Sequence, residues 1–490
     1  MKFAKWLKRI VFSLILLVVG AIGIRLYDIQ RGPDLQLWHT YVPDEMDADE
    51  IDSADWNDYI KRENSLFNEV KRNVTDKLDV QQQTELNRYY VDSPIYPEKF
   101  PTNWNRSYIM MPDARPKGAV VLLHGLTDTP YSLRHIANNY RQHGYIAIGI
   151  RLPGHGTVPA ALTDVNWQDW LAATRLAVRE AQKLAGNDVP LHMVGFSNGG
   201  ALAMKYTLDA LDNPGLAKPQ RVILISPMIG ITSFARFSGM AGWPAFLPAF
   251  AKAAWLGIMP EFNPFKYNSF PTNAARQSFL LTKALQSQIV TDSRNKKMAS
   301  LPPILTFQSV MDSTVSTRAI VTALYNRLPD NGSEIVLFDL NHAVRFNSLL
   351  RRTSYTALSR LLPAAPRLYR TTIITNANPG TTEMEIRTTP AGKTEQSVET
   401  LQGQRYLPDV YSLSHVALPF PLSDSLYGRY PHPLNQYGIS LGTFAARGER
   451  SVLVVGLDSL MRQSSNPFFP YMIMRINEGI DAGAAAPGSD

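Results

Sequence analysis

From residue 106 onward, the chain alternates short apolar runs with longer amphipathic stretches. The runs contain few polar residues, which is typical of strands buried on both faces of a sheet. Stretches of helical character, such as 167–184 and 199–211, would cross from one strand to the next. This pattern predicts an α/β fold whose mostly parallel central sheet is covered by helices on both faces. The expected strands are 107–111, 119–123, 146–150, 191–194, 222–225, 304–307 and 335–338.

Two stretches break this alternation. Residues 228–300 are rich in aromatic residues and longer than a crossover between parallel strands requires. We expect a lid insertion over an apolar pocket, although the same rings could pack the insertion's own core. Residues 355–406 are polar and β-prone, which predicts a small antiparallel β-rich insertion. A last helical segment, 467–480, precedes a flexible tail over 483–490. The aromatic residues of the lid are Phe234, Phe237, Trp243, Phe246, Phe250, Trp255, Phe262, Phe265 and Phe270.

The first 27 residues have the pattern of an export signal or a membrane anchor. Four cations within the first nine residues precede the uncharged apolar run 10–24. We favour an uncleaved membrane anchor, with the remaining chain on the non-cytoplasmic, periplasmic side. A cleaved signal peptide and secretion are the alternative, because the run is shorter than the roughly 20 residues of a full span. We expect the polar, helical extension 28–105 to be a spacer and packing helix outside the main core.

Composition narrows the class of protein further. Of the 490 residues, 45% are hydrophobic and 19% charged, which is typical of a globular chain. The net charge of +7 is spread along the chain without a long basic run outside the N-terminus, so we expect no nucleic-acid partner. The absence of cysteine excludes disulfides, thiol catalysis and Cys-ligated zinc.

A candidate nucleophile stands in the sequence L-H-M-V-G-F-S-N-G-G over 191–200. A short apolar run leads into Gly195-x-Ser197-x-Gly199, and a helix-compatible stretch follows. A strand, a sharp turn and a helix are the setting of a nucleophile elbow, in which the serine hydroxyl is exposed at the tip of the turn. A plain strand–turn–helix connection is the alternative interpretation.

Two further elements fit acyl transfer at Ser197. Directly after the strand 119–123 comes His124-Gly125-Leu126, and the N–H groups of Leu126 and Asn198 could form an oxyanion hole. His124 itself is expected to be structural, because the base should follow the acid in chain order. Asp312 lies just beyond the apolar run 304–307, where the acid of a triad belongs, although it could be an ordinary turn residue.

The sequence offers two histidines for the catalytic base. His342 follows the last expected strand and lies 30 positions after Asp312. His415 lies in an apolar, Ser-flanked stretch, and the chain continues beyond it into a terminal helix. If that helix closes the domain, residues 355–406 are an insertion before the catalytic loop. We therefore predict His415 as the base and keep His342 as the alternative.

Three blocks carry a resemblance to a known superfamily. They are L-L-H-G-L-T-D-T-P-Y-S-L-R at 122–134, R-L-P-G-H-G-T at 151–157 and G-F-S-N-G-G at 195–200. With them, residues 106–482 resemble the α/β-hydrolase superfamily, in its monoacylglycerol lipase, carboxylesterase and serine aminopeptidase-like branch. The resemblance implies the roles given above for Ser197, Asp312 and the two oxyanion donors, and a structural His155. The chain departs from simple members by adding more than a hundred residues after Asp312.

Together these features predict a serine hydrolase that cleaves carboxylic esters through an acyl-enzyme. The aromatic insertion and the N-terminal segment favour a small ester or lipid substrate with a medium or long acyl chain, of monoacylglycerol or lysophospholipid type. The reaction requires no metal or organic cofactor. A peptidase or an acyltransferase could use the same triad. An inactive, membrane-tethered binding protein on a hydrolase scaffold is the alternative of another class.

Overall fold

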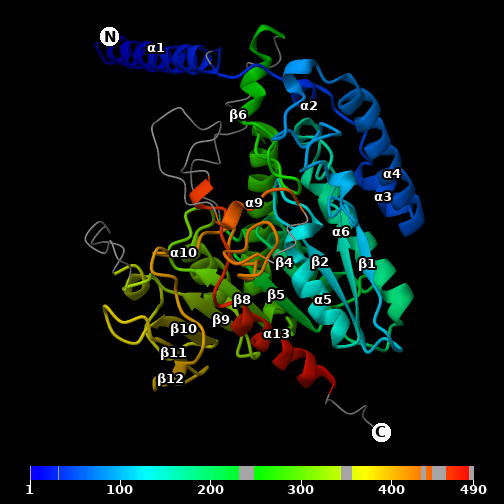
Figure 1. Ribbon diagram of the computed structural model, residues 1–490. Coiled ribbons are helices and arrows are strands. Elements are labelled where there is room, and N and C mark those ends of the chain that lie inside the picture. Colours follow the sequence, from blue (N-terminus) through cyan, green and yellow to red (C-terminus); the bar gives the residue numbers. More distant parts are fainter. Residues whose placement is uncertain are drawn as a thin grey trace.

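A single ten-stranded sheet organises the molecule (Figure 1). The computed structural model describes residues 2–30, 32–230, 248–343, 356–431, 437–443 and 460–484. The strand order is β1-β3-β2-β4-β5-β8-β9-β10-β11-β12; β3 through β10 run parallel, and β1, β11 and β12 pair antiparallel at the two edges. The strands are β1 (Tyr108–Met110), β2 (Gly118–Leu123), β3 (Tyr145–Ile150), β4 (Leu191–Phe196), β5 (Arg221–Ile225), β8 (Ile304–Ser309), β9 (Glu334–Phe338), β10 (Arg370–Asn376), β11 (Met384–Thr389) and β12 (Ser397–Leu401).

Helices cover both faces of this sheet, as predicted. Alternate side chains of β2 show why: Val121 and Leu123 pack in one core with α6, α7 and α9, while Val120 and Leu122 pack in another with α5 and α13. Strands buried on both faces need apolar residues at every position, which explains their unbroken apolar runs. The helices are α2 (Leu37–Thr40), α3 (Ala48–Ser53), α4 (Trp56–Asn73), α5 (Arg134–Gln142), α6 (Trp167–Ala185), α7 (Asn198–Asp212), α9 (Thr272–Arg294), α10 (Thr317–Ala319) and α13 (Phe469–Ala484).

The β-rich segment after β9 extends the main sheet. Strand β10 lies parallel to β9, with Ile373 opposite Leu337. Strands β11 and β12 then continue antiparallel to the edge. The sequence indicated the antiparallel strands but not that β10 joins the central sheet, because β10 has only two apolar residues, Ile373 and Ile374, and lacks the apolar run of its neighbours. A further apolar run in the sequence, 451–456, lies outside the described residues.

The extension 28–105 packs into the main core, so the expectation of a spacer outside it was wrong. Ile51, Trp56 and Tyr59 are buried in the same core cluster as α6. Asp55 caps α4 by accepting the Asp58 N–H at 2.9 Å, and the buried positions of α4 recur every three or four residues. Sequence periodicity reveals such an apolar face, but it does not reveal which core the face joins.

Three aromatic residues of the predicted lid are buried in two clusters. Phe262 and Phe265 are buried with Tyr131, Phe420 and Tyr437, which come from distant parts of the chain. Trp255, in the short strand β6 (Trp255–Gly257) that pairs with β7 (Phe270–Pro271), is buried with Trp38 and Tyr89 of the extension. These lid rings therefore pack against residues from other parts of the chain in two separate clusters. Residues Phe234, Phe237, Trp243 and Phe246 lie outside the described residues, and the lid itself stays a prediction.

Helix α1 (Lys2–Gln30) projects away from the sheet (Figure 1). Its large apolar side chains exposed to solvent are Trp6, Val11, Phe12, Leu16, Leu17, Val19, Ile24 and Tyr27. Among the described residues, no helix is both long enough and apolar enough to cross a membrane.

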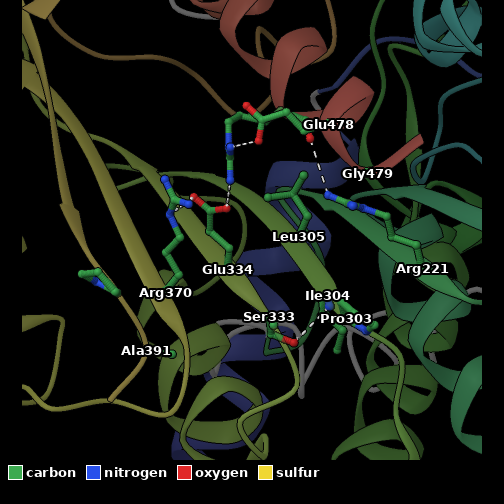
Figure 2. A pocket seen from close by; sticks show the side chains of 13 residues that line it. Arg221, Pro303, Ile304, Leu305, Ser333, Glu334, Arg370, Ala391, Glu478 and Gly479 are labelled. Atoms are coloured by element: carbon green, nitrogen blue, oxygen red, sulfur yellow. Dashed lines mark hydrogen bonds and ion pairs between the residues drawn. The ribbon is translucent and has the colours of Figure 1, made fainter. Parts of the chain in front are cut away.

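A cavity of about 390 Å³ lies at the amino ends of the parallel strands (Figure 2). Arg221 begins β5, Ile304 begins β8, Glu334 begins β9 and Arg370 begins β10. Helix α13 closes one side through Gly479 and its neighbours. The predicted catalytic residues lie on loops at the other end of these strands, their carboxyl ends.

Candidate active site

Ser197 occupies a strained turn between β4 and α7. Its backbone has φ 54° and ψ −117°, a region that residues with a side chain rarely adopt. The turn is fixed by its own backbone: the Ser197 N–H donates to the Ile225 carbonyl at 2.9 Å, and the Ser197 carbonyl accepts the Met228 N–H at 2.9 Å. An observed outlier of this kind, over-determined by its surroundings, is typical of a functional position. The predicted elbow is therefore present.

Gly199 allows the first turn of α7 to touch the end of β2. A Cβ atom at this position would lie 1.9 Å from the Leu123 carbonyl oxygen, so any side chain here would force the strand and the helix apart. The close approach also brings the loop after β2 beside the serine, because an atom in the Cβ position of Gly125 would lie 3.2 Å from the Ser197 Cβ.

The two predicted oxyanion donors lie on either side of this contact. The Asp128 N–H donates to the Gly125 carbonyl at 3.3 Å, which closes a tight turn around Leu126 and Thr127. Thr127 has φ 61°, and its carbonyl accepts the Tyr267 N–H at 2.8 Å. Asn198 is the first residue of α7, where backbone N–H groups have no partner within the helix.

His124 holds the loop after β2, as its expected structural role requires. Its Nε2 accepts the Leu152 N–H at 3.1 Å, so its Nδ1 carries the proton and donates to the Gly125 carbonyl at 2.9 Å. Burial and the neighbouring His155 hold the pKa of His124 far below its ordinary value, which keeps the ring neutral. The ring of His155 lies 4.9 Å from it, and burial lowers the pKa of His155 to about 3.

Asp312 and His415 form a buried pair. His415 Nδ1 donates to Asp312 Oδ2 at 2.8 Å, and their side chains are 7% and 0% exposed, respectively. The other carboxylate oxygen accepts the N–H groups of Thr314 and Val315 at 2.8 and 3.1 Å. Burial opposes ionisation, but His415 and these N–H groups together hold the pKa of Asp312 below its ordinary value. Asp312 is thus a carboxylate that orients the imidazole.

The imidazole of His415 lies next to the elbow. Its ring stacks on Phe196, with centroids 5.3 Å apart and an interplanar angle of 29°. Phe196 directly precedes Ser197 in the chain. Because Asp312 accepts from Nδ1, the opposite nitrogen, Nε2, is the unprotonated one. The arrangement brings together an acid, an imidazole of the tautomer required for a general base, and the serine turn.

His342 has different partners. Its Nε2 lies 3.3 Å from Asp339 Oδ2, three residues earlier in the chain. Asp339 also accepts from the Thr375 hydroxyl at 3.0 Å. The structure therefore pairs His342 with Asp339 on the loop after β9, and it pairs Asp312 with His415.

Acidic side chains near the site are engaged by cations or by hydrogen-bond donors. Asp424 accepts from Arg134 at 2.6 Å and from His135 at 2.9 Å. Burial would raise the pKa of Asp424, but these two partners hold it well below its ordinary value. In the described part of the chain, no three His, Asp or Glu side chains gather as ligands for a metal ion.

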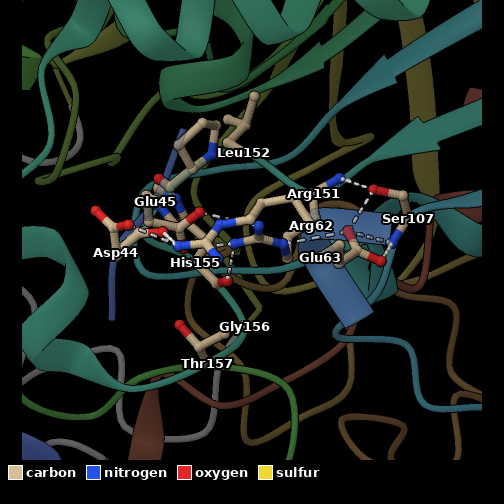
Figure 3. A network of polar contacts seen from close by, with 12 residues as sticks. Asp44, Glu45, Arg62, Glu63, Ser107, Arg151, Leu152, His155, Gly156 and Thr157 are labelled. Atoms are coloured by element: carbon tan, nitrogen blue, oxygen red, sulfur yellow. Dashed lines mark hydrogen bonds and ion pairs between the residues drawn. The ribbon is translucent and has the colours of Figure 1, made fainter. Parts of the chain in front are cut away.

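A buried ion network joins the extension to the loop R-L-P-G-H-G-T (Figure 3). Glu45 binds the Arg151 guanidinium through two contacts, at 2.8 and 3.0 Å, and Glu63 accepts from the Arg151 Nε at 3.2 Å. Tyr59 donates to the Arg151 carbonyl at 2.5 Å. The Arg151 side chain is 1% exposed. Because the next residue, Leu152, donates to His124, the network supports the loop after β2 that carries Leu126.

Comparisons with known proteins bear on the fold and the class of the chain. Residues 114–300 match the family model described as Serine aminopeptidase, S33. The thermostable monoacylglycerol lipase of Bacillus sp. (strain H-257) is 27% identical over 175 residues, 35% of this chain and 65% of that protein. Phospholipase YtpA of Bacillus subtilis (strain 168) is 25% identical over 118 residues, 24% of this chain and 43% of that protein. These matches, with the sheet topology, support the α/β-hydrolase superfamily.

The chain has the α/β-hydrolase fold. A solved structure of a metagenome-derived lipolytic enzyme shares 22% identity, with a TM-score of 0.38 over 49% of this chain and 87% of that one. The alignments span less than two thirds of either curated relative. Both relatives are lipases or phospholipases by name, so the comparisons point to hydrolases of the esterase and lipase type.

Sequence reasoning missed the residues that support this α/β-hydrolase site from the extension. Glu45 and Glu63 lie in a polar segment rich in acids, and nothing local distinguishes them from solvated glutamates. The only signal was Arg151, an arginine at the end of a fully apolar strand, where a buried cation needs a carboxylate partner.

Replacing Arg151 by methionine should destabilise the protein strongly. The substitution leaves Glu45 and Glu63 buried without their cation, which costs about 3–5 kcal/mol of unfolding free energy. Urea unfolding of the full chain measures it. The matched control is Arg141→Met, because Arg141 pairs with the exposed Asp113 and should change stability by less than about 1 kcal/mol. Equal effects of the two substitutions would contradict a supporting role for the network.

Proposed function

We propose that this protein is a serine hydrolase that cleaves carboxylic esters. Ser197 is the nucleophile, His415 the base, Asp312 the acid, and the N–H groups of Leu126 and Asn198 bind the oxyanion. One observation carries the proposal: the Asp312-bound imidazole of His415 stacks on Phe196, directly beside the strained serine turn. The pairing of His342 with Asp339 supports the choice of His415 over that alternative.

The geometry supports the following mechanism. With Asp312 accepting from Nδ1, His415 takes the Ser197 hydroxyl proton on Nε2, and the serine oxygen attacks the ester carbonyl. The negative charge that develops on the carbonyl oxygen is stabilised by the two backbone N–H groups. His415 then returns the proton to the departing alcohol. A water molecule, deprotonated by the same imidazole, hydrolyses the acyl-enzyme and frees Ser197.

The proposed substrate is a small ester or lipid with one acyl chain, of monoacylglycerol or lysophospholipid type. The names of the two curated relatives, a monoacylglycerol lipase and a phospholipase, support it. The aromatic cluster of Phe262, Phe265, Tyr131 and Phe420 would give an acyl chain apolar surroundings. This cluster adjoins the loop after β2, because the Thr129 hydroxyl donates to the Phe265 carbonyl at 2.8 Å.

A peptidase activity is the second candidate, since the matching family model is described as Serine aminopeptidase. The triad and the oxyanion hole would serve an amide as well as an ester. The two substrates differ in the leaving group that His415 protonates, which is an alcohol for the ester and an amine for the amide.

We also propose that α1 attaches the chain to a membrane, with the remaining residues on the non-cytoplasmic side. The support is the row of exposed apolar side chains on α1 and the cluster of cations at its start. Exposed apolar side chains of this kind are more stable in the apolar region of a membrane than in water.

Ser197→Ala should abolish turnover of p-nitrophenyl esters, and His415→Ala should lower kcat by about 10⁴-fold or more. His342→Ala is the matched control and should leave kcat within a few fold of the wild type. A fluorophosphonate probe should label the wild-type chain and not Ser197→Ala. Full turnover by Ser197→Ala would refute Ser197 as the nucleophile. A larger loss of kcat in His342→Ala than in His415→Ala would assign the role of base to His342. A wild-type chain that the probe does not label would indicate an inactive scaffold.

Ester and amide substrates with the same acyl group should separate the two candidate activities. We expect kcat/KM to be higher for a p-nitrophenyl ester than for the matching anilide. The ratio of the two values should exceed the ratio of the rates at which hydroxide hydrolyses the same two compounds. Comparable acceleration of a free N-terminal aminoacyl anilide would favour the peptidase.

Fractionation of cells expressing the full chain should recover it with the membranes after carbonate washing. A chain that begins at residue 31 should be soluble. In spheroplasts, added protease should digest the full chain, because the catalytic residues are expected outside the cytoplasm. Recovery of the full chain in the soluble fraction would contradict the anchor, and a shortened chain in the medium would favour the cleaved signal peptide.

A further inference from the structure

The cavity at the amino ends of the strands is lined by three arginines. Arg221, Arg370 and Arg475 face it together with Glu334 and Glu478, which leaves a surplus of one positive charge. The rest of the wall includes apolar atoms of Pro303, Ile304, Leu305, Pro390 and Ala391. Figure 2 shows Arg370 and Glu334 reaching toward one another, while Arg221 reaches from β5 toward α13.

Two of these arginines already have carboxylate partners. Glu334 binds Arg475 and lies 3.5 Å from the Arg370 Nε, and Glu478 also binds Arg475. The negative charge of Glu334 is therefore neutralised on both sides. Arg475 is 11% exposed, and its Nε is buried without a hydrogen-bond partner among the described residues.

Arg221 is the cation without a carboxylate. Within the described part of the chain it forms no ion pair, its buried Nε has no hydrogen-bond partner, and its Nη2 reaches only the Arg475 carbonyl, at 3.5 Å. Burial and the neighbouring Arg475 lower the pKa of Arg221. A buried N–H donor such as the Arg221 Nε is costly to leave unused unless an acceptor satisfies it.

Helix α13 holds this guanidinium in place. A Cβ atom at Gly479 would lie 1.4 Å from the Arg221 Nη1, so the glycine leaves the space that the arginine occupies. The planar group thus lies against the helix backbone at the wall of the cavity. A fixed guanidinium is well suited to binding two oxygens of one ligand at once.

We propose that this cavity binds a small organic oxyanion, a carboxylate or a phosphate monoester, that carries a short apolar group. The oxyanion would accept from Arg221, and its apolar part would contact Pro303, Leu305 and Ala391. The volume of about 390 Å³ accommodates a ligand of this size. The site lies at the amino ends of the strands, whereas Ser197 lies at their carboxyl ends. The proposal therefore does not depend on whether Ser197 is a nucleophile.

Calorimetric titration of the full chain with butyrate and with butyl phosphate tests the proposal. At least one of the two should bind saturably, and the tighter one identifies the oxyanion; 1-butanol should not bind. Arg221→Gln should weaken the affinity by about tenfold or more. Arg318→Gln, which removes an exposed arginine of α10, should bind like the wild type.

A second variant guards against a simple loss of folding. Gly479→Ala keeps every charge but displaces the Arg221 guanidinium. It should therefore lower the affinity for the same anion while the circular dichroism spectrum stays like that of the wild type. Equal affinity of Arg221→Gln and the wild type would place the bound anion elsewhere and overturn the proposal. No saturable binding of either anion by the wild type would overturn it as well.

Discussion

The contact between Gly199 and the Leu123 carbonyl is the constraint on which the site depends. It allows β2, β4 and the first turn of α7 to meet without a side chain between them. The serine turn and the loop that carries Leu126 become neighbours only because of this approach. The strained backbone of Ser197 costs on the order of 1–3 kcal/mol, and its hydrogen bonds to Ile225 and Met228 hold it in place.

Buried charge links this turn to the rest of the chain. Burying the Arg151 guanidinium at 1% exposure without Glu45 and Glu63 would cost several kcal/mol, because an isolated ion in the interior loses its hydration. The residues that neutralise it come from the extension, about a hundred positions earlier in the chain. The extension is thus part of the structure around the site, although it contributes none of the proposed catalytic groups.

Local patterns allowed the sequence to predict much of the fold and site. The strands β1 to β5, β8 and β9 were predicted from apolar runs, and Ser197, Leu126 and Asp312 from their positions after such runs. Features that depend on distant partners were not accessible. Nothing near His415 shows that its ring stacks on Phe196, and nothing in β10 shows that it pairs with β9. The environment of Glu63 likewise depends on Arg151, 88 residues away.

The segment after β9 contributes polar groups to both ends of the parallel strands. It supplies His415 at the carboxyl ends of the strands, where Asp312 and Ser197 lie. It then forms α13, which brings Arg475 and Gly479 to the amino ends, against Arg221. Because the strands of a parallel sheet run in one direction and are buried along their length, polar side chains would be costly to bury in the middle of a strand. They collect instead at the amino and carboxyl ends of the strands. The length of this segment, which made the base ambiguous in the sequence, therefore has a structural reason: one stretch of chain completes the candidate active site, and the next encloses the cavity on the opposite edge.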